Sequence, residues 1–140
     1  MTAKKYLQQL RILDLKIRQR EEQVNELKSK AFGSGSISGG GERVQTSVAG
    51  DKLSENVSKY VDLQAEIESL TEAFIVKKHE IITAIQELDD PRYISILYKR
   101  YVNFETFERI ACDMNYNYTW TCELHGRALQ ALERAETTRS

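Results

Sequence analysis

Three side chains near the C-terminal end of the sequence could bind a metal ion. Cys122 and His125 lie three residues apart, so they would share one face of a helix, and Cys112 lies in the preceding segment. A structural zinc ion takes four ligands, and the further ligands at suitable spacing are missing. We therefore expect helix packing to account for these residues, with no metal site and no cofactor.

Other residues that carry chemistry in enzymes have simpler explanations. His79 lies in a long acidic segment, where a solvent-exposed or helix-packing role fits best. The paired acids Asp89 and Asp90 precede a proline, which is typical of a helix N-cap. The glycine run 39–41 lacks the Lys-Ser or Lys-Thr pair of a phosphate-binding loop. We therefore expect that the protein is not an enzyme.

A larger set of side chains could contact double-stranded DNA. Cations neutralise phosphates, while polar side chains hydrogen-bond to base edges. The cations that could contact phosphates are Lys99, Arg100, Arg109 and Arg127. The polar and aromatic residues that could reach the bases or the backbone are Asn117, Tyr118, Thr119, Trp120, Cys122 and Glu123. Together they form the predicted DNA-contacting set.

Packing explains several of the aromatic residues equally well. Trp120 could stack on a base, contact a thymine methyl group or cap the small core, and Tyr116 and Tyr118 could pack at its rim. Four further aromatic residues are expected in the core: Tyr93, Tyr98, Tyr101 and Phe107. Residues 92–140 hold seven Arg or Lys against six acids, which is a weak positive charge for a DNA-binding segment.

Two helices and a turn would position these side chains. Ile110, Ala111 and Met114 give the first segment an apolar face. In the second segment, the residues at three- and four-residue spacing are Thr121, Leu124, Ala128 and Leu132. Residues 115–117 break the helix, and Asn117 is a good N-cap because its side chain can accept a hydrogen bond from a free amide. This pattern is typical of a helix-turn-helix, which presents its second helix to DNA.

The same stretch resembles region 4 of sigma-70-type factors. Its counterparts are residues 106–111 (TFERIA), the turn 115–117 (NYN) and residues 128–129 (AL), preceded by a helix from Tyr93 to Tyr101. With the upstream segment 41–52 (GERVQTSVAGDK), the chain is similar to small sigma-like transcription regulators of phages and prophages, of the RinA and ArpU type. The resemblance implies promoter binding in a bacterial host cytoplasm and contact with RNA polymerase.

Length and composition favour an all-α protein. The chain has 140 residues, of which 41% are hydrophobic and 29% charged, with one proline, so it can form one modest core and an elongated coiled coil. No apolar run approaches the roughly 18 residues that would suggest a membrane span, and no apolar signal segment follows the first lysines. We expect a cytoplasmic protein with reduced thiols and no membrane partner.

The N-terminal part, residues 1–89, predicts a long helical hairpin. Residues 3–31 carry a four-heptad apolar stripe in which Arg20 fills the one polar position, and residues 51–88 carry a second amphipathic run. Residues 1–30 hold eight Lys or Arg and four acids, whereas residues 51–91 hold four and ten, so opposite charges would flank an antiparallel seam. Pairing within one chain and pairing between two copies, as a homo-oligomer, both fit this pattern.

A connector and a domain boundary complete the organisation. Residues 32–50 hold six of the seven glycines and predict a flexible link where the helix must stop, although Glu42 to Gln45 could be a recognised segment. Asp90 is a plausible N-cap before Pro91, so a helix-turn-helix domain would occupy residues 90–136. Its helices would span residues 91–102, 104–113 and 118 to about 136.

Three functional hypotheses follow. The first is a phage-encoded sigma-like regulator that binds promoter DNA through the C-terminal helix-turn-helix and uses the hairpin for oligomerisation or for docking on RNA polymerase. The second is a protein-interaction adaptor whose degenerate helix-turn-helix has no affinity for DNA. The third is a DNA-packaging component like a phage small terminase, which also combines a helix-turn-helix with a coiled coil.

Overall fold

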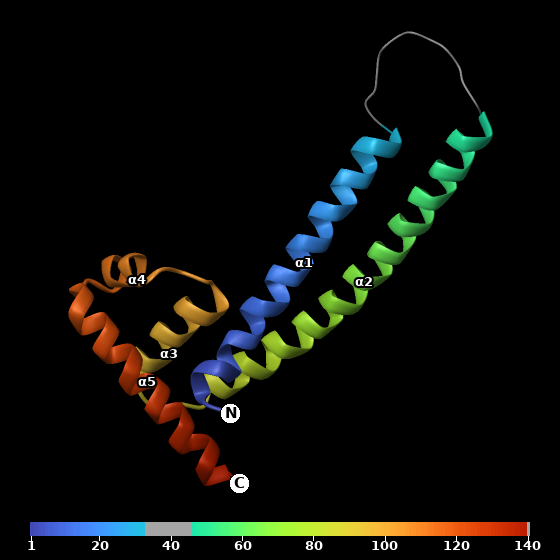
Figure 1. Cartoon of the computed structure of the whole chain (residues 1–140). Helices are drawn as coiled ribbons and strands as arrows, with labels where there is room; N and C mark the ends of the chain where they lie inside the picture. The colour runs from blue at the N-terminus through green and yellow to red at the C-terminus, as the bar shows by residue number, and fades with distance from the viewer. Residues whose placement is uncertain (33–45, 140) are drawn as a thin grey trace. The chain divides into compact units, whose positions relative to one another are not determined.

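The computed structural model describes residues 1–32 and 46–139, and every regular element in this part of the chain is a helix (Figure 1). The elements in order are α1 (Ala3–Phe32), α2 (Thr46–Gln86), α3 (Pro91–Leu97), the π-helical turn η1 (Tyr98–Val102), α4 (Phe107–Met114) and α5 (Tyr118–Arg139). The predicted all-α class is therefore confirmed. Among the described residues, no helix is both long and apolar enough to cross a membrane. The segment Glu42 to Gln45 lies outside the described residues.

The start of α2 corrects one expectation. Helix begins at Thr46, so the last five residues of the predicted connector are helical. Four of these five residues tolerate a helix, and the remaining one, Gly50, disfavours it by only about 1 kcal/mol relative to alanine. A helix of 41 residues can absorb that penalty.

The described chain divides into two compact units, one of residues 15–72 and the other of residues 1–14 with 73–140. In the first unit, Arg20 pairs with Glu66 at 3.1 Å, and the Lys28 ammonium lies 5.7 Å from the centroid of the Tyr60 ring. Because the α2 partner number falls as the α1 number rises, the two segments run antiparallel there, as the charge pattern predicted. The sequence predicts a domain boundary between residues 89 and 90. That residues 90–136 fold independently of residues 1–89 stays a prediction.

The second unit contains the hydrophobic core. Its buried apolar residues are Ala3, Leu7, Leu10, Ile81, Ala84, Ile85, Leu88, Ile96, Leu97, Tyr101, Val102, Ile110, Leu124, Ala128 and Leu132. The start of α1 and the end of α2 thus share one core with the three C-terminal helices. Hydrogen bonds also join these helices. The Tyr6 hydroxyl of α1 donates to Glu80 of α2 at 2.9 Å, and the Ala3 amide of α1 donates to Glu133 of α5 at 3.0 Å.

The helix that begins at Pro91 follows its capping signals. The Asp90 carboxylate accepts a hydrogen bond from the Arg92 amide at 2.9 Å, and Pro91 occupies the first helical position, so the predicted cap is confirmed. The hydrogen bonds with Arg92 hold the pKa of Asp90 below its ordinary value. The last turn is wider than predicted, because the Asn103 amide donates to the Tyr98 carbonyl five residues back.

The following helix starts later than predicted, at Phe107 instead of Phe104. Phe104 has a φ of 58°, in the left-handed region, which cannot continue a right-handed helix. The Thr106 hydroxyl then caps α4 by accepting a hydrogen bond from the Arg109 amide at 3.2 Å. The Phe104 ring packs under the Arg11 guanidinium, 4.8 Å from its centroid.

Candidate nucleic-acid interface

The helices α4 and α5 are joined by a turn of three residues, Asn115 to Asn117, as predicted. Asn115 ends α4 in the left-handed conformation, with φ 59° and ψ 43°, and the Tyr116 amide donates to the Ala111 carbonyl at 2.9 Å. The Asn117 side chain accepts a hydrogen bond from the Trp120 amide at 2.7 Å, which confirms the predicted N-cap of α5. The turn is therefore fixed at its first end by the left-handed backbone of Asn115 and at its second end by the Asn117 side chain.

One face of α5 is buried against α3 and α4 (Figure 1). Its buried residues are Thr121, Leu124, His125, Ala128 and Leu132. All four positions predicted from helical spacing are among them. On α4, Ile110 and Ala111 are buried and Met114 is half-buried, again as predicted.

The opposite face of α5 is open to solvent over its first three turns. The members of the predicted DNA-contacting set that are exposed at the turn and on α5 are Asn117, Tyr118, Thr119, Glu123 and Arg127. Trp120 and Cys122 are half-buried, so they lie at the edge of this face. The structure therefore brings the polar residues of the set onto one surface that begins at the turn.

Arg127 is held against its own helix. Its guanidinium pairs with the Glu123 carboxylate at 2.9 Å and lies 5.1 Å from the centroid of the Trp120 ring. Trp120 in turn meets Tyr116 edge to face, with centroids 6.4 Å apart. Trp120 thus packs at the rim of the core, which is one of its predicted roles, and also contacts the cation. Contact of Trp120 with a base stays a prediction.

Two further cations of the set share one acid. Lys99 and Arg109 lie 3.8 Å and 3.7 Å from the Asp113 carboxylate. Arg109 is 72% exposed, and pairs of this kind contribute less than about 1 kcal/mol. Either cation could therefore leave Asp113 for a phosphate at little cost.

Arg100 has a structural task that the sequence did not indicate. It is half-buried, donates to the Glu105 carbonyl at 2.9 Å and lies 4.3 Å from the centroid of the Phe107 ring. These contacts hold the loop that leads into α4. Contact of Arg100 with a phosphate stays a prediction.

Tyr118 and Cys122 form a pair one helical turn apart. The hydrogen bond between their side chains is the main reason that the pKa of Tyr118 is raised, and the negative charge of Glu108 adds to the effect. Because this pKa is raised, the Tyr118 hydroxyl stays protonated at neutral pH, and because the side chain is 51% exposed, the hydroxyl can donate to an acceptor on a ligand. Cys112 and Cys122 are free thiols, the first exposed and the second half-buried.

Sequence reasoning did not predict the buried polar pair formed by Tyr101 and His125. His125 is buried, and its Nε2 lies 2.7 Å from the Tyr101 hydroxyl, while Phe107 meets the imidazole edge to face at 4.8 Å. Burial lowers the pKa of His125 to about 4, and the positive charges of Arg100 and Lys4 push it in the same direction. Position 125 follows the buried Leu124 on the inner face of α5, and that spacing could have placed the residue in the core.

His125 is therefore neutral at ordinary pH, and its Nε2 is hydrogen-bonded to the Tyr101 hydroxyl. Among the described residues, no group of three or more His, Cys, Asp or Glu side chains could hold a metal ion. Asp90 serves as the helix cap that the sequence suggested. His79 is exposed on α2.

These features define an all-α protein whose last two helices, joined by a three-residue turn, present a polar face. The chain belongs to a family described as proteins of unknown function, DUF1492, whose model matches residues 26–133. That match covers the end of α1, the whole of α2, the helices α3, η1 and α4, and most of α5. No curated protein and no solved structure matches the chain.

Proposed function

We propose that this protein is a phage-encoded, sigma-like transcription regulator that binds promoter double-stranded DNA through α4 and α5. The observation that carries the proposal is the exposed face at the start of α5, where Tyr118 and Thr119 follow Asn117, the last residue of a fixed three-residue turn. Their amide and hydroxyl groups can hydrogen-bond to base edges. The buried opposite face fixes α5, so these groups are presented without a large loss of entropy on binding.

Cations beside this face supply the phosphate contacts. Lys99, Arg109 and Arg127 each lie in a weak ion pair with an acid on the protein surface. On binding, a phosphate replaces the carboxylate partner, and displaced counterions favour the complex.

The long helices have a separate task in this proposal. The apolar seam between α1 and α2 in residues 15–72 offers a second surface, suited to oligomerisation or to docking on RNA polymerase. A sigma-like regulator needs such a second contact, because binding to the promoter does not by itself bring polymerase to the site.

A second candidate function is a protein-interaction adaptor with no affinity for DNA. The same ion pairs favour it, since Glu123 and Asp113 place negative charge directly beside the candidate contacts. Residues 92–140 carry only one more cation than acid. A protein surface tolerates this mixture better than a phosphate backbone does.

Selection of fragments from the host phage or prophage genome separates the two functions. The full-length protein is incubated with a sheared genomic pool, and the bound fragments are sequenced. A DNA-binding regulator enriches a few fragments that share a sequence, and the double substitution Tyr118→Ala with Arg127→Ala abolishes the enrichment. Arg134→Ala is the matched control, because Arg134 lies on the same helix two turns after Arg127 and is also exposed. No enrichment by the wild type, together with capture of a polymerase subunit, would favour the adaptor.

A further inference from the structure

The described side chains of the unit formed by residues 15–72 do not enclose a core. Among its described side chains only Val24 is buried, at 5% exposed, whereas the seam residues Ile17, Leu27, Leu63 and Ile67 are half-buried. Two antiparallel helices can shield one another from one side only. Helices in water take most of their stability from burial of an apolar face, so this seam calls for more cover than the described residues of one chain supply.

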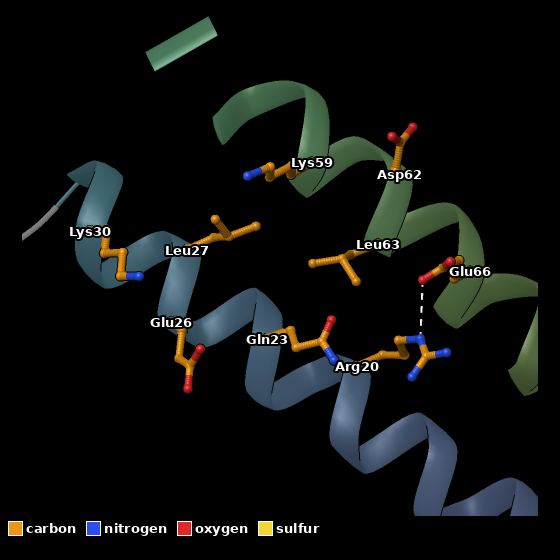
Figure 2. Close-up of a pocket in the computed structure, with 9 residues that line it drawn as sticks. All are labelled: Arg20, Gln23, Glu26, Leu27, Lys30, Lys59, Asp62, Leu63 and Glu66. Carbon is orange, nitrogen blue, oxygen red and sulfur yellow. Dashed lines mark hydrogen bonds and ion pairs between the residues drawn. The ribbon is translucent and has the colours of Figure 1, made fainter. Parts of the chain in front are cut away.

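A groove runs along the open side of the seam. It has a volume of about 520 Å³ and is lined by Arg20, Gln23, Glu26, Leu27, Lys30, Lys59, Asp62, Leu63 and Glu66. Figure 2 shows Leu27 and Leu63 pointing toward each other from α1 and α2, with the charged residues around them. The apolar floor and charged rim resemble the surface of a helix pair that receives further helices.

The rim carries both signs of charge in equal number. Its three cations and three acids include one pair, Arg20 with Glu66, which Figure 2 marks. The structure gives no ion pair within the described residues for the remaining four, Glu26, Lys30, Lys59 and Asp62, and all four are exposed. A surface of this kind is electrostatically neutral as a whole, yet it has unpaired charges of both signs to satisfy.

We propose that this groove receives the same groove of a second copy of the chain, so that residues 15–72 of two chains form an antiparallel four-helix bundle. In a two-fold pairing, each residue of a patch meets a different residue of the same patch, and the reverse contact also forms. A rim with two unpaired cations and two unpaired acids is suited to such self-association. A partner of one predominant charge would instead favour a rim of the opposite sign.

The charges of the two helices determine how the copies align. Residues 15–30 of α1 hold five cations and three acids, whereas residues 52–72 of α2 hold two and five. An α1 segment therefore lies beside the α2 segment of the second copy, because like segments would repel. The same arrangement gives cover to Leu53 and Val57, which are 47% and 44% exposed in one chain.

This assembly does not depend on binding to DNA, and a charge-exchange experiment tests it in the absence of DNA. One full-length variant carries Glu26→Lys with Asp62→Lys, and another carries Lys30→Glu with Lys59→Glu. Each gives the rim one predominant charge. We expect the wild type to be a dimer by sedimentation equilibrium and each variant alone to dimerise about 100-fold more weakly. An equimolar mixture of the two variants is expected to restore dimers.

A control pair has the same change in charge outside the groove. Asp89→Lys with Glu108→Lys alters two exposed acids outside residues 15–72, and dimerisation is expected to be unchanged. Far-UV circular dichroism of every variant verifies that the helices are retained. A monomeric wild type at about 0.1 mM would overturn the proposal. So would variants that dimerise as well as the wild type, or a mixture that stays monomeric.

Discussion

The hydroxyl of Tyr101 lies 2.7 Å from Nε2 of His125 in the buried centre of the C-terminal helices. The pair joins η1 to α5, and Phe107 of α4 packs against the imidazole edge, so all three helices meet at one polar contact. A hydrogen bond inside a core fixes a single arrangement, because any slip would leave two buried polar groups unpaired. The orientation of α5 relative to the preceding helices is therefore tied to this pair.

The pair predicts that stability falls as the pH is lowered from 7 to 5. The pKa of His125 is about 4 in the folded protein and about 6.5 in the unfolded chain, so only the unfolded chain takes up a proton in this range. The free energy of unfolding should fall by about 1–2 kcal/mol between pH 7 and pH 5, after allowance for solvent screening. Urea unfolding at the two pH values measures this change. In His125→Gln the change should be much smaller, whereas His79→Gln, at an exposed site, should retain it.

A second prediction concerns the core shared by α1 and the C-terminal helices. Leu7 is completely buried in that core, so Leu7→Ala should lower the free energy of unfolding by about 2–4 kcal/mol. The single tryptophan, Trp120, lies on α5, and its fluorescence reports unfolding of the C-terminal helices directly. Leu15→Ala, on the same helix but 43% exposed, should change the transition by less than about 0.5 kcal/mol. An unchanged Trp120 transition in Leu7→Ala would mean that these helices fold without α1.

The cap of α5 gives a third prediction. Asn117→Ala removes the acceptor for the Trp120 amide and should destabilise the protein by about 1 kcal/mol. Asn117→Asp keeps an acceptor at the same position and should be close to the wild type in thermal unfolding. If Asn117 also contacts DNA, Asn117→Asp should weaken binding despite normal stability, because it adds a negative charge beside the phosphates.

Glu123 provides a fourth prediction, one of increased affinity. Its carboxylate pairs with Arg127 on the exposed face, so it both holds the cation and repels phosphates. Glu123→Gln should raise the affinity for duplex DNA about three- to tenfold at low salt, measured by fluorescence anisotropy. Glu133→Gln, also exposed but lying ten residues further along the helix, is the control and should have little effect. A decrease in affinity for Glu123→Gln would indicate that the carboxylate itself accepts a hydrogen bond from a base.

Local signals in the sequence were sufficient to predict the caps of α3 and α5. Asp90 with Pro91, and Asn117 three residues before Trp120, fix helix starts through contacts between near neighbours, so spacing alone predicted them. The buried face of α5 could also be predicted from the sequence, because its buried residues repeat with the period of a helix.

Features that depend on contacts between residues distant in sequence could not be predicted from the sequence. Tyr101 and His125 are 24 residues apart, and nothing in either local segment identifies the other as a partner. The task of Arg100 depends on a loop in which Phe104 adopts a left-handed backbone, an uncommon state for a bulky residue. The early start of α2 was missed because glycine was taken to end a helix, although length and packing can outweigh one glycine.

The salt dependence of DNA binding tests the central claim most directly. Anisotropy of a labelled duplex, taken from the enriched fragments, is measured with the full-length protein over a range of salt concentrations. If Lys99, Arg109 and Arg127 contact phosphates, the slope of log K against log salt should be about −3, and Arg127→Ala should reduce its magnitude by about 1. Arg134→Ala should leave the slope unchanged. A slope near zero, or equal slopes for the wild type and Arg127→Ala, would contradict DNA recognition by this face of α5.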